Sequence, residues 1–187
     1  MTQGSIATRY AKALYEEAKA HSVDEDIYEY FGMLLISMKT EQELQEALIN
    51  PRIPADKKFQ LLMMASGYDS TKAEGNAPSL YARFIRLVLD HKREMFMRLI
   101  IYVYRDMFRE DRQIDRVVIE TAEGIDDKTQ EHLIEAIKGH TGRKVECELK
   151  VNPRIIGGFR LRIGDRRYDC SYKTKLDKIR EKLCLTK

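Results

Sequence analysis

Cysteine is scarce in this sequence of 187 residues, which argues against the sites that cysteines most often build. The three cysteines, Cys147, Cys170 and Cys184, match no zinc or redox spacing, and their odd number does not suit a disulfide framework. We interpret each as a small, partly buried apolar residue of a protein in a reducing cytoplasm. No His, Asp or Asn is placed to suggest a catalytic thiol instead.

Histidines are almost as few, and they do not gather. The four are scattered without metal-ligand spacing, so we expect solvated or structural roles. The Gly157-Gly158 pair is not a phosphate loop, because no Lys-Ser or Lys-Thr follows it and no third glycine stands at dinucleotide spacing. We therefore expect a protein that is not an enzyme, with no cofactor and no metal. The histidines are His21, His91, His132 and His140.

Long apolar runs are also missing. Stretches such as Leu99–Val103 are interrupted by charge within a few residues, whereas a helix that crosses a bilayer needs roughly 20 apolar residues. Residues 1–13 carry Arg9 and Lys12 on an amphipathic pattern and lack the apolar core and cleavage site of a secretory signal. We expect neither a membrane span nor export.

The chain does have the composition of a folded protein, with 43% hydrophobic residues and charges of both signs interspersed. Its net charge of +3 is unevenly distributed. Residues 143–187 hold 14 Lys and Arg against 6 Asp and Glu, a net of +8, whereas residues 1–142 have a net of −5. A basic C-terminal region suits nucleic acid, an anionic membrane face or an acidic protein, and charge alone does not choose among them.

The first 110 residues show the apolar spacing of successive amphipathic helices with short links, which predicts a six-helix bundle. Asn50-Pro51 and Gly67 are expected to end helices, and Ser70–Pro78 is expected to be a loop. Two residue pairs have the spacing of a capping box at a helix start: Ser22 with Glu25, and Thr40 with Glu43.

The apolar period then changes from that of helices to that of strands. Val117–Ala122 is rich in β-formers, and apolar residues alternate with charged ones over Lys144–Val151, which predicts a strand buried on one face. A helix is expected between them over Asp126–Lys138. The alternation resumes over Phe159–Ile163, before a hairpin turn at Gly164-Asp165.

The fold class expected is therefore α+β, with the domain boundary placed where charged residues crowd and the helical period lapses. Residues 1–110 are predicted to form the helical bundle. Residues 111–187 are predicted to form a small α/β domain that ends in a basic helix from about Lys173. A domain this small has a limited core and is expected to depend on a partner.

Several stretches resemble one family. They are Ala7–Tyr15, with its Tyr-Ala-Lys-Ala run, Leu48–Ile53, Val151–Phe159, Ile163–Asp165 and Asp169–Ser171. They are similar to the delta subunit of F-type ATP synthases, called the oligomycin-sensitivity-conferring protein in mitochondria, and the resemblance spans almost the whole chain. Each match also has a structural interpretation.

Asn50 and Pro51 end a helix in that interpretation, and Gly157 and Gly158 permit positive backbone angles or a close chain approach. Asp169 or Ser171 caps the final helix. None of these residues is assigned a catalytic role.

The resemblance implies a stator subunit of the peripheral stalk, present in one copy per complex. It would lie on the cytoplasmic face of the bacterial plasma membrane and meet the membrane only through the complex. Residues 1–110 would bind the N-terminal segments of the alpha subunits, and residues 111–187 would hold the b subunits. These contacts would stop the catalytic head from turning with the rotor, so that ion transport drives ATP synthesis.

In this family the groove for the alpha segments lies between the first and fifth helices. We expect its lining to be Tyr10, Ala13, Leu14, Phe84, Leu87 and Val88, although core and groove faces share the same helical spacing. For the stalk we expect the apolar stripe of the final helix to make the contact, namely Leu176, Ile179 and Leu183.

A nucleic-acid-binding protein is the alternative. The basic C-terminal region interleaves arginines such as Arg160 and Arg162 with Phe159, Tyr168 and Tyr172, a combination that can bind single strands. The same alternation is also the ordinary outer face of a half-buried sheet, which we consider the better interpretation.

Overall fold

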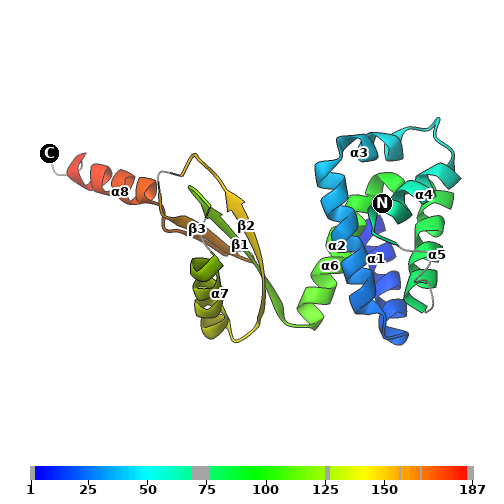
Figure 1. Ribbon diagram of the computed structural model, residues 1–187, viewed down its shortest axis with the longest axis horizontal. Coiled ribbons are helices and arrows are strands. Elements are labelled where there is room, and N and C mark those ends of the chain that lie inside the picture. The colour runs from blue at the N-terminus through cyan, green and yellow to red at the C-terminus, as the bar shows by residue number, and fades with distance from the viewer. Residues whose placement is uncertain (1–2, 69–75, 125–126, 156, 165, 185–187) are drawn as a thin grey trace. The chain divides into compact units, whose positions relative to one another are not determined.

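The computed structural model shows helices followed by a mixed sheet with two further helices, so the predicted α+β class is confirmed (Figure 1). The structure describes residues 3–68, 76–124, 127–155, 157–164 and 166–184. The chain divides into two compact units, residues 1–108 and 109–187. Of the helices in these described ranges, none is both long enough and apolar enough to cross a bilayer.

Helices make up the first unit. Most of the loop predicted at Ser70–Pro78 lies outside the described residues, but α5 begins at Asn76, two residues before the predicted end of that loop. The helices are α1 (Gln3–Ala20), α2 (Asp24–Thr40), α3 (Gln42–Ile49), α4 (Ala55–Ala65), α5 (Asn76–Asp90) and α6 (Met97–Asp111), with a 3-10 turn, η2 (Glu94–Phe96), before α6.

Aromatic rings fill the centre of this unit. Phe31 of α2 is fully buried and makes edge-to-face contacts with Tyr81, Phe84 and Tyr104, at ring-centroid distances of 5.7, 6.1 and 5.1 Å. Edge-to-face pairs add to the stabilisation that burial alone provides. Phe31 therefore links α2 to both α5 and α6.

Both predicted capping boxes are wrong. Ser22 has φ +56° and ends α1 instead of starting α2: its N–H donates to Lys19 O, and the N–H of Val23 donates to Ala18 O. α2 begins at Asp24 without a side-chain cap, and α3 likewise begins without one. Thr40 is the last residue of α2, and its hydroxyl donates to Ile36 O. In both places the carbonyls of the preceding helix engage the residue that was expected to cap the next one.

The predicted end of α4 at Gly67 is confirmed. Gly67 has φ +68°, its N–H donates to Met64 O, and the N–H of Tyr68 donates to Met63 O. This pair of bonds satisfies carbonyls at the helix end and needs a left-handed residue, a conformation that glycine adopts without steric cost.

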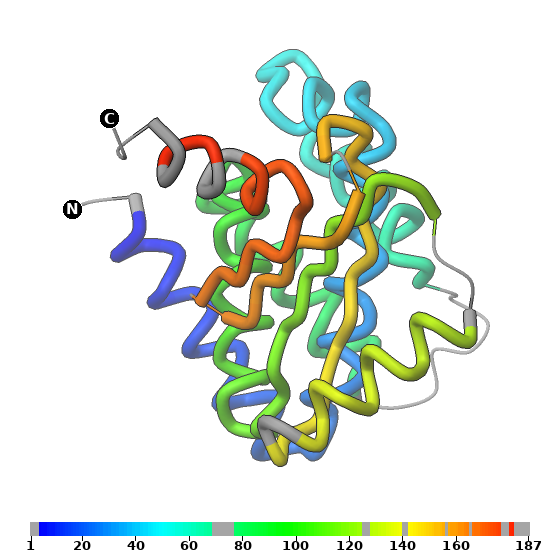
Figure 2. Tube along the Cα trace, turned by 90° about the vertical axis from the view of Figure 1, so that its left-hand side faces the viewer, coloured from blue at the N-terminus to red at the C-terminus, as the bar shows by residue number. Residues whose placement is uncertain are grey.

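The second unit is a four-stranded sheet in the order β2-β1-β3-β4, with β1 and β2 parallel and the other neighbours antiparallel. The strands lie side by side in Figure 2, with β1 in green between β2 in yellow and β3 in orange. The elements are β1 (Ile114–Thr121), α7 (Asp127–Thr141), β2 (Lys144–Val151), β3 (Phe159–Ile163), β4 (Arg166–Asp169) and α8 (Tyr172–Cys184).

A small core lies between α7 and one face of this sheet. Val117 and Ile119 of β1 are fully buried there and pack with Ile137 of α7. The expectation that all of β2 has a buried face is only half right, because Leu149 and Val151 are 36% and 60% exposed. Val145 and Cys147, in the first half of the strand, are the β2 residues that pack against this core.

Candidate functional site

A groove of about 320 Å³ lies between α1 and α5. α1 turns its fully buried alanines, Ala7, Ala11 and Ala18, toward the interior, and such small side chains let a helix lie close to its neighbours. The adjacent stripe of α1 forms one wall of the groove. Its residues are Tyr10, Ala13, Leu14 and Glu17.

The opposite wall comes from α5, which buries Tyr81, Ile85 and Val88 completely on its core side. Leu87 is 46% exposed, a large apolar side chain left open to solvent in the groove. The α5 residues that line the groove are Leu80, Arg83, Phe84 and Leu87.

The groove brings together all but one of the side chains that the resemblance implied. Tyr10, Ala13, Leu14, Phe84 and Leu87 line it. Val88 does not, because it is fully buried on the core side of α5, so its assignment to the groove is corrected.

Three lining residues were not anticipated. Leu80 lies four residues before Phe84, Arg83 lies four before Leu87, and Glu17 lies three after Leu14. The same helical spacing could therefore have found them. Glu17 and Arg83, from opposite walls, give the rim one charge of each sign.

The end of α5 adds an aromatic contact at this groove. The rings of Tyr10 and His91 meet edge to face, with centroids 6.5 Å apart. His91 Nδ1 lies 2.8 Å from the carbonyl oxygen of Leu87, one helical turn earlier. The contact links Tyr10, on one wall, to the end of the helix that forms the other.

The lining of this groove is suited to binding a helix. In the core of the unit, burial raises the pKa of Tyr81 and Tyr104 well above the usual value of 10.0, because the charged form of each phenol would lose its solvation there. The described residues include no group of three or more His, Cys, Asp or Glu that could hold a metal ion. An apolar groove with charges on its rim can accept the apolar face of an amphipathic helix.

The glycine pair of the second unit allows a close chain approach. Gly158 has φ +79°, and a Cβ at this position would lie 2.6 Å from the carbonyl oxygen of Cys170 and 3.0 Å from Cα of Ser171. Gly157 has φ +75°, and its carbonyl accepts the N–H of Tyr172 at 3.1 Å. The glycines thus let this segment lie directly against the start of α8.

Asp169 and Ser171 organise that helix start. Asp169 Oδ1 accepts both the N–H of Ser171, at 2.9 Å, and its hydroxyl, at 2.6 Å. The Ser171 hydroxyl oxygen in turn accepts the N–H of Thr174 at 3.4 Å, as an N-cap does. The hydrogen bonds from Ser171, with smaller contributions from Thr174 and Arg160, hold the pKa of Asp169 far below its usual 3.8.

Asn50 and Pro51 begin a turn whose sequence occurs twice. Asn50 Oδ1 accepts the N–H of Arg52 at 2.9 Å directly after α3, and Asn152 Oδ1 accepts the N–H of Arg154 at 3.2 Å directly after β2. Each Asn-Pro-Arg-Ile stretch therefore stops a different kind of element with the same side-chain bond.

On α8, Leu176 is 59% exposed, a large apolar side chain left open to solvent. Ile179 and Leu183 lie within the span of α8, but their side chains fall outside the described residues. The predicted stalk contact is thus represented by one described side chain.

Comparisons with known proteins agree on one family. The family described as "ATP synthase delta (OSCP) subunit" matches residues 6–183. "ATP synthase subunit delta" of Parabacteroides distasonis is 41% identical over 180 residues, covering 96% of this chain and 96% of its own. The subunit of the same name from Salinibacter ruber is 32% identical over 183 residues, covering 98% and 93%.

A solved structure has the same fold. It is a chain of the Toxoplasma gondii mitochondrial ATP synthase hexamer, with a TM-score of 0.73 at 17% identity, and the match covers 98% of both chains. At this identity the likeness concerns the fold.

Proposed function

Because this chain belongs to the ATP synthase delta (OSCP) subunit family, we propose that its two units hold two different partners in the peripheral stalk. The chain is a non-catalytic stator subunit of ATP synthase, and the resemblance noted in its sequence is confirmed. The proposal concerns which surfaces meet which partner.

The first unit binds the N-terminal segments of the alpha subunits in the groove between α1 and α5. The observation that carries this assignment is the half-exposed Leu87 beside the deeper Leu14 and Phe84. An amphipathic helix can cover Leu87 with its apolar face while its charged residues meet Glu17 and Arg83 on the rim. The helices within residues 1–110 serve as one six-helix bundle that presents this groove.

The second unit, residues 111–187, holds the b subunits. Its support is the net charge of +8 over residues 143–187 together with the exposed Leu176 of α8. Opposite charges speed the encounter with an acidic helix, and buried apolar contacts then slow its release.

Because both binding surfaces lie on one chain, each contact that forms raises the effective concentration for the other. The chain therefore stays attached to the catalytic head and to the stalk at once, as resistance to rotor torque requires. In this arrangement one copy of the chain per complex connects the catalytic head to the stalk, on the cytoplasmic face of the bacterial plasma membrane. The comparisons give no support to nucleic-acid binding, since the relatives reported above are ATP synthase subunits.

Two binding titrations with the full-length chain test the proposal, one with the N-terminal peptide of the alpha subunit from the same organism and one with the soluble C-terminal segment of its b subunit. Hydrogen exchange then locates each contact. We expect the alpha peptide to protect α1 and α5, and the b segment to protect amides within residues 112–187. Protection of the same unit by both ligands would overturn the division of labour.

A further inference from the structure

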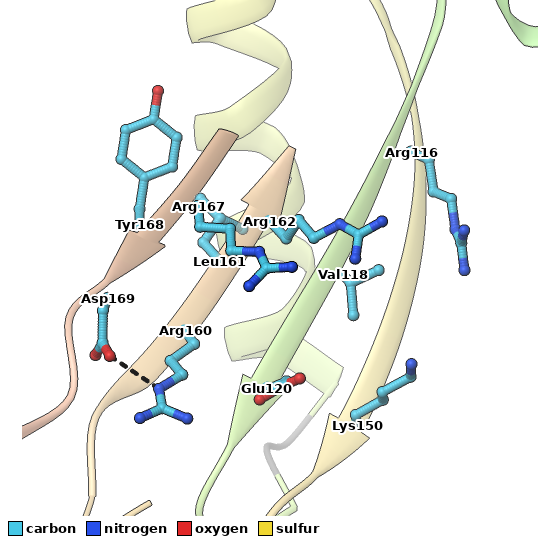
Figure 3. Close-up of a pocket in the computed structure, with 10 residues that line it drawn as sticks. All are labelled: Arg116, Val118, Glu120, Lys150, Arg160, Leu161, Arg162, Arg167, Tyr168 and Asp169. Carbon is cyan, nitrogen blue, oxygen red and sulfur yellow. Dashed lines mark hydrogen bonds and ion pairs between the residues drawn. The ribbon is translucent and has the colours of Figure 1, made fainter. Parts of the chain in front are cut away.

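The face of the sheet that points away from α7 is open and charged. Because side chains alternate along a strand, Val117 and Ile119 face α7, whereas Arg116, Val118 and Glu120 face the other way. A hollow of about 420 Å³ lies over these outward side chains (Figure 3). Its floor includes Val118, which is 8% exposed.

Most of the charges on this open face are matched by a neighbour. Arg116 pairs with Glu148 at 2.7 Å, and Lys150 Nζ lies 3.6 Å from the other oxygen of Glu148. Arg160 donates to Asp169 at 2.9 Å, the contact dashed in Figure 3. Such exposed or half-exposed pairs are individually weak, but they leave these groups with a local partner.

Arg162 and Arg167 are different. They lie directly opposite each other on β3 and β4, in a register that places two like charges side by side. Arg162 Nε donates to the carbonyl of Gly164 at 3.2 Å, and neither guanidinium forms an ion pair with a carboxylate of the residues that the structure describes. Like charges placed opposite each other destabilise a sheet. Both side chains extend over the sheet toward Val118 (Figure 3).

We propose that Arg162 and Arg167 form a carboxylate-binding site that receives a Glu or Asp side chain from an acidic helix of the stalk. The inference rests on the proposed function, in which the second unit holds the b subunits, and it adds the surface and the chemistry of that contact. A carboxylate between two guanidiniums accepts hydrogen bonds from both and removes their mutual repulsion. Val118, in the floor, offers an apolar contact to the stem of the same side chain.

The charges around the pair favour a protein helix over a nucleic acid. Glu120, Glu148 and Asp169 stand among the basic residues of the same face, and Glu148 and Asp169 occupy Arg116, Lys150 and Arg160, so these cations do not form a row for a strand that carries a phosphate at every nucleotide. A single carboxylate on a helix needs to contact only the two guanidinium groups of Arg162 and Arg167. The surface thus has a local deficit of negative charge and not a continuous basic track.

The test is a titration of the full-length chain with the soluble C-terminal segment of the b subunit, comparing Arg167→Glu with Arg166→Glu. These neighbours change the net charge equally but face opposite sides of β4, since Arg166 is in register with Ile163 of the core face. We expect Arg167→Glu to weaken binding about tenfold and Arg166→Glu to weaken it less than about threefold. The milder variants Arg162→Gln and Arg167→Gln should also weaken binding.

Each outcome has a distinct meaning. If the unaltered chain does not bind the b segment, the proposed function fails, and this site fails with it. If the unaltered chain binds but Arg162 and Arg167 variants bind equally well, only the site is wrong. If those variants still bind the b segment but no longer bind mixed single-stranded RNA, Arg162 and Arg167 bind nucleic acid and the proposal is overturned. A b segment in which one acidic residue is replaced by Lys should restore binding to Arg167→Glu.

Discussion

Lys58 Nζ donates to Glu94 Oε1 at 2.7 Å, which joins the first turn of α4 to η2 across 36 residues of sequence. The Lys58 side chain is only 4% exposed and that of Glu94 18%. The second Glu94 oxygen, Oε2, has no hydrogen-bond partner among the described residues. The buried Lys58 ammonium group is thus paired with Glu94 inside the first unit.

Removal of one member of this pair should destabilise the protein strongly. We expect Lys58→Met or Glu94→Gln to lower the free energy of unfolding by about 3 kcal/mol, because each leaves a charge buried without its partner. The double variant should lose less than the sum of the two. Urea unfolding measures all three, and Asp56→Asn is the control, since the exposed Asp56–Arg86 pair should contribute less than about 1 kcal/mol. Additive losses would contradict a coupled pair.

Leu87→Glu should weaken binding of the alpha N-terminal peptide without unfolding the chain. Leu87 is half-exposed, so a carboxylate there remains solvated in the free protein but must be desolvated under an apolar helix face. We expect at least about a tenfold loss of affinity in calorimetry. Met64→Glu, at an exposed position of α4 outside the groove, should bind normally.

The neighbouring position provides the opposite test. Val88→Glu should unfold the first unit, because it places a charge among fully buried side chains. If Leu87→Glu also melted the unit, Leu87 would belong to the core and the groove assignment would fail. Circular dichroism during heating separates these cases.

Gly158→Ala should destabilise the second unit by at least about 2 kcal/mol, because the positive φ adds strain and the new Cβ meets backbone atoms that cannot move aside. Gly139 is the matched control. It lies inside α7, and a Cβ there would meet nothing within 4 Å apart from its chain neighbours and the nearby backbone of the helix itself, so Gly139→Ala should stabilise the same unit by about 0.5–1 kcal/mol. Hydrogen exchange of the strands in low urea measures both changes. If Gly158→Ala and Gly139→Ala changed stability equally, Gly158 would not be needed for the close approach of the chain to the start of α8.

Asp169, which accepts two hydrogen bonds from the capping residue Ser171, should make stability depend on pH. Its pKa in the folded chain lies below the usual 3.8, so its contribution is complete above that value and is lost as the pH falls through the folded pKa. The stability difference between the unaltered chain and Asp169→Asn should therefore shrink as the pH is lowered below about 4. Ser171→Ala removes the main cause, so an NMR titration should show the Asp169 pKa rise toward 3.8. An unchanged pKa would contradict this role of Ser171.

Local patterns were sufficient for most of the secondary structure. The alternation over Lys144–Val151 predicted a strand with the bounds that β2 has. This worked because the apolar period of an element follows from its own backbone geometry. The predicted capping boxes were wrong because residue type alone does not determine an N-cap. Ser22 has the residue type of an N-cap, yet its N–H donates to a carbonyl at the end of α1 and its φ is positive.

The groove could be located from the resemblance but not resolved residue by residue. Leu87 and Val88 are adjacent and both apolar, and the spacing along α5 places both near the same face. Only the packing of α5 in the first unit, where Val88 is fully buried and Leu87 half-exposed, separates them. Burial depends on neighbours distant in sequence, which a single periodic pattern does not specify.

The sequence by itself determined the fold class, the family and the absence of any recognisable catalytic motif, because each of these follows from short patterns of residue type and spacing. The tertiary structure decided which apolar side chains remain open between α1 and α5. It also decided which arginines on the sheet have a carboxylate within reach, since Arg160 meets Asp169 whereas Arg162 faces Arg167. Those outcomes depend on strand register and helix packing, which bring together groups that the sequence keeps apart.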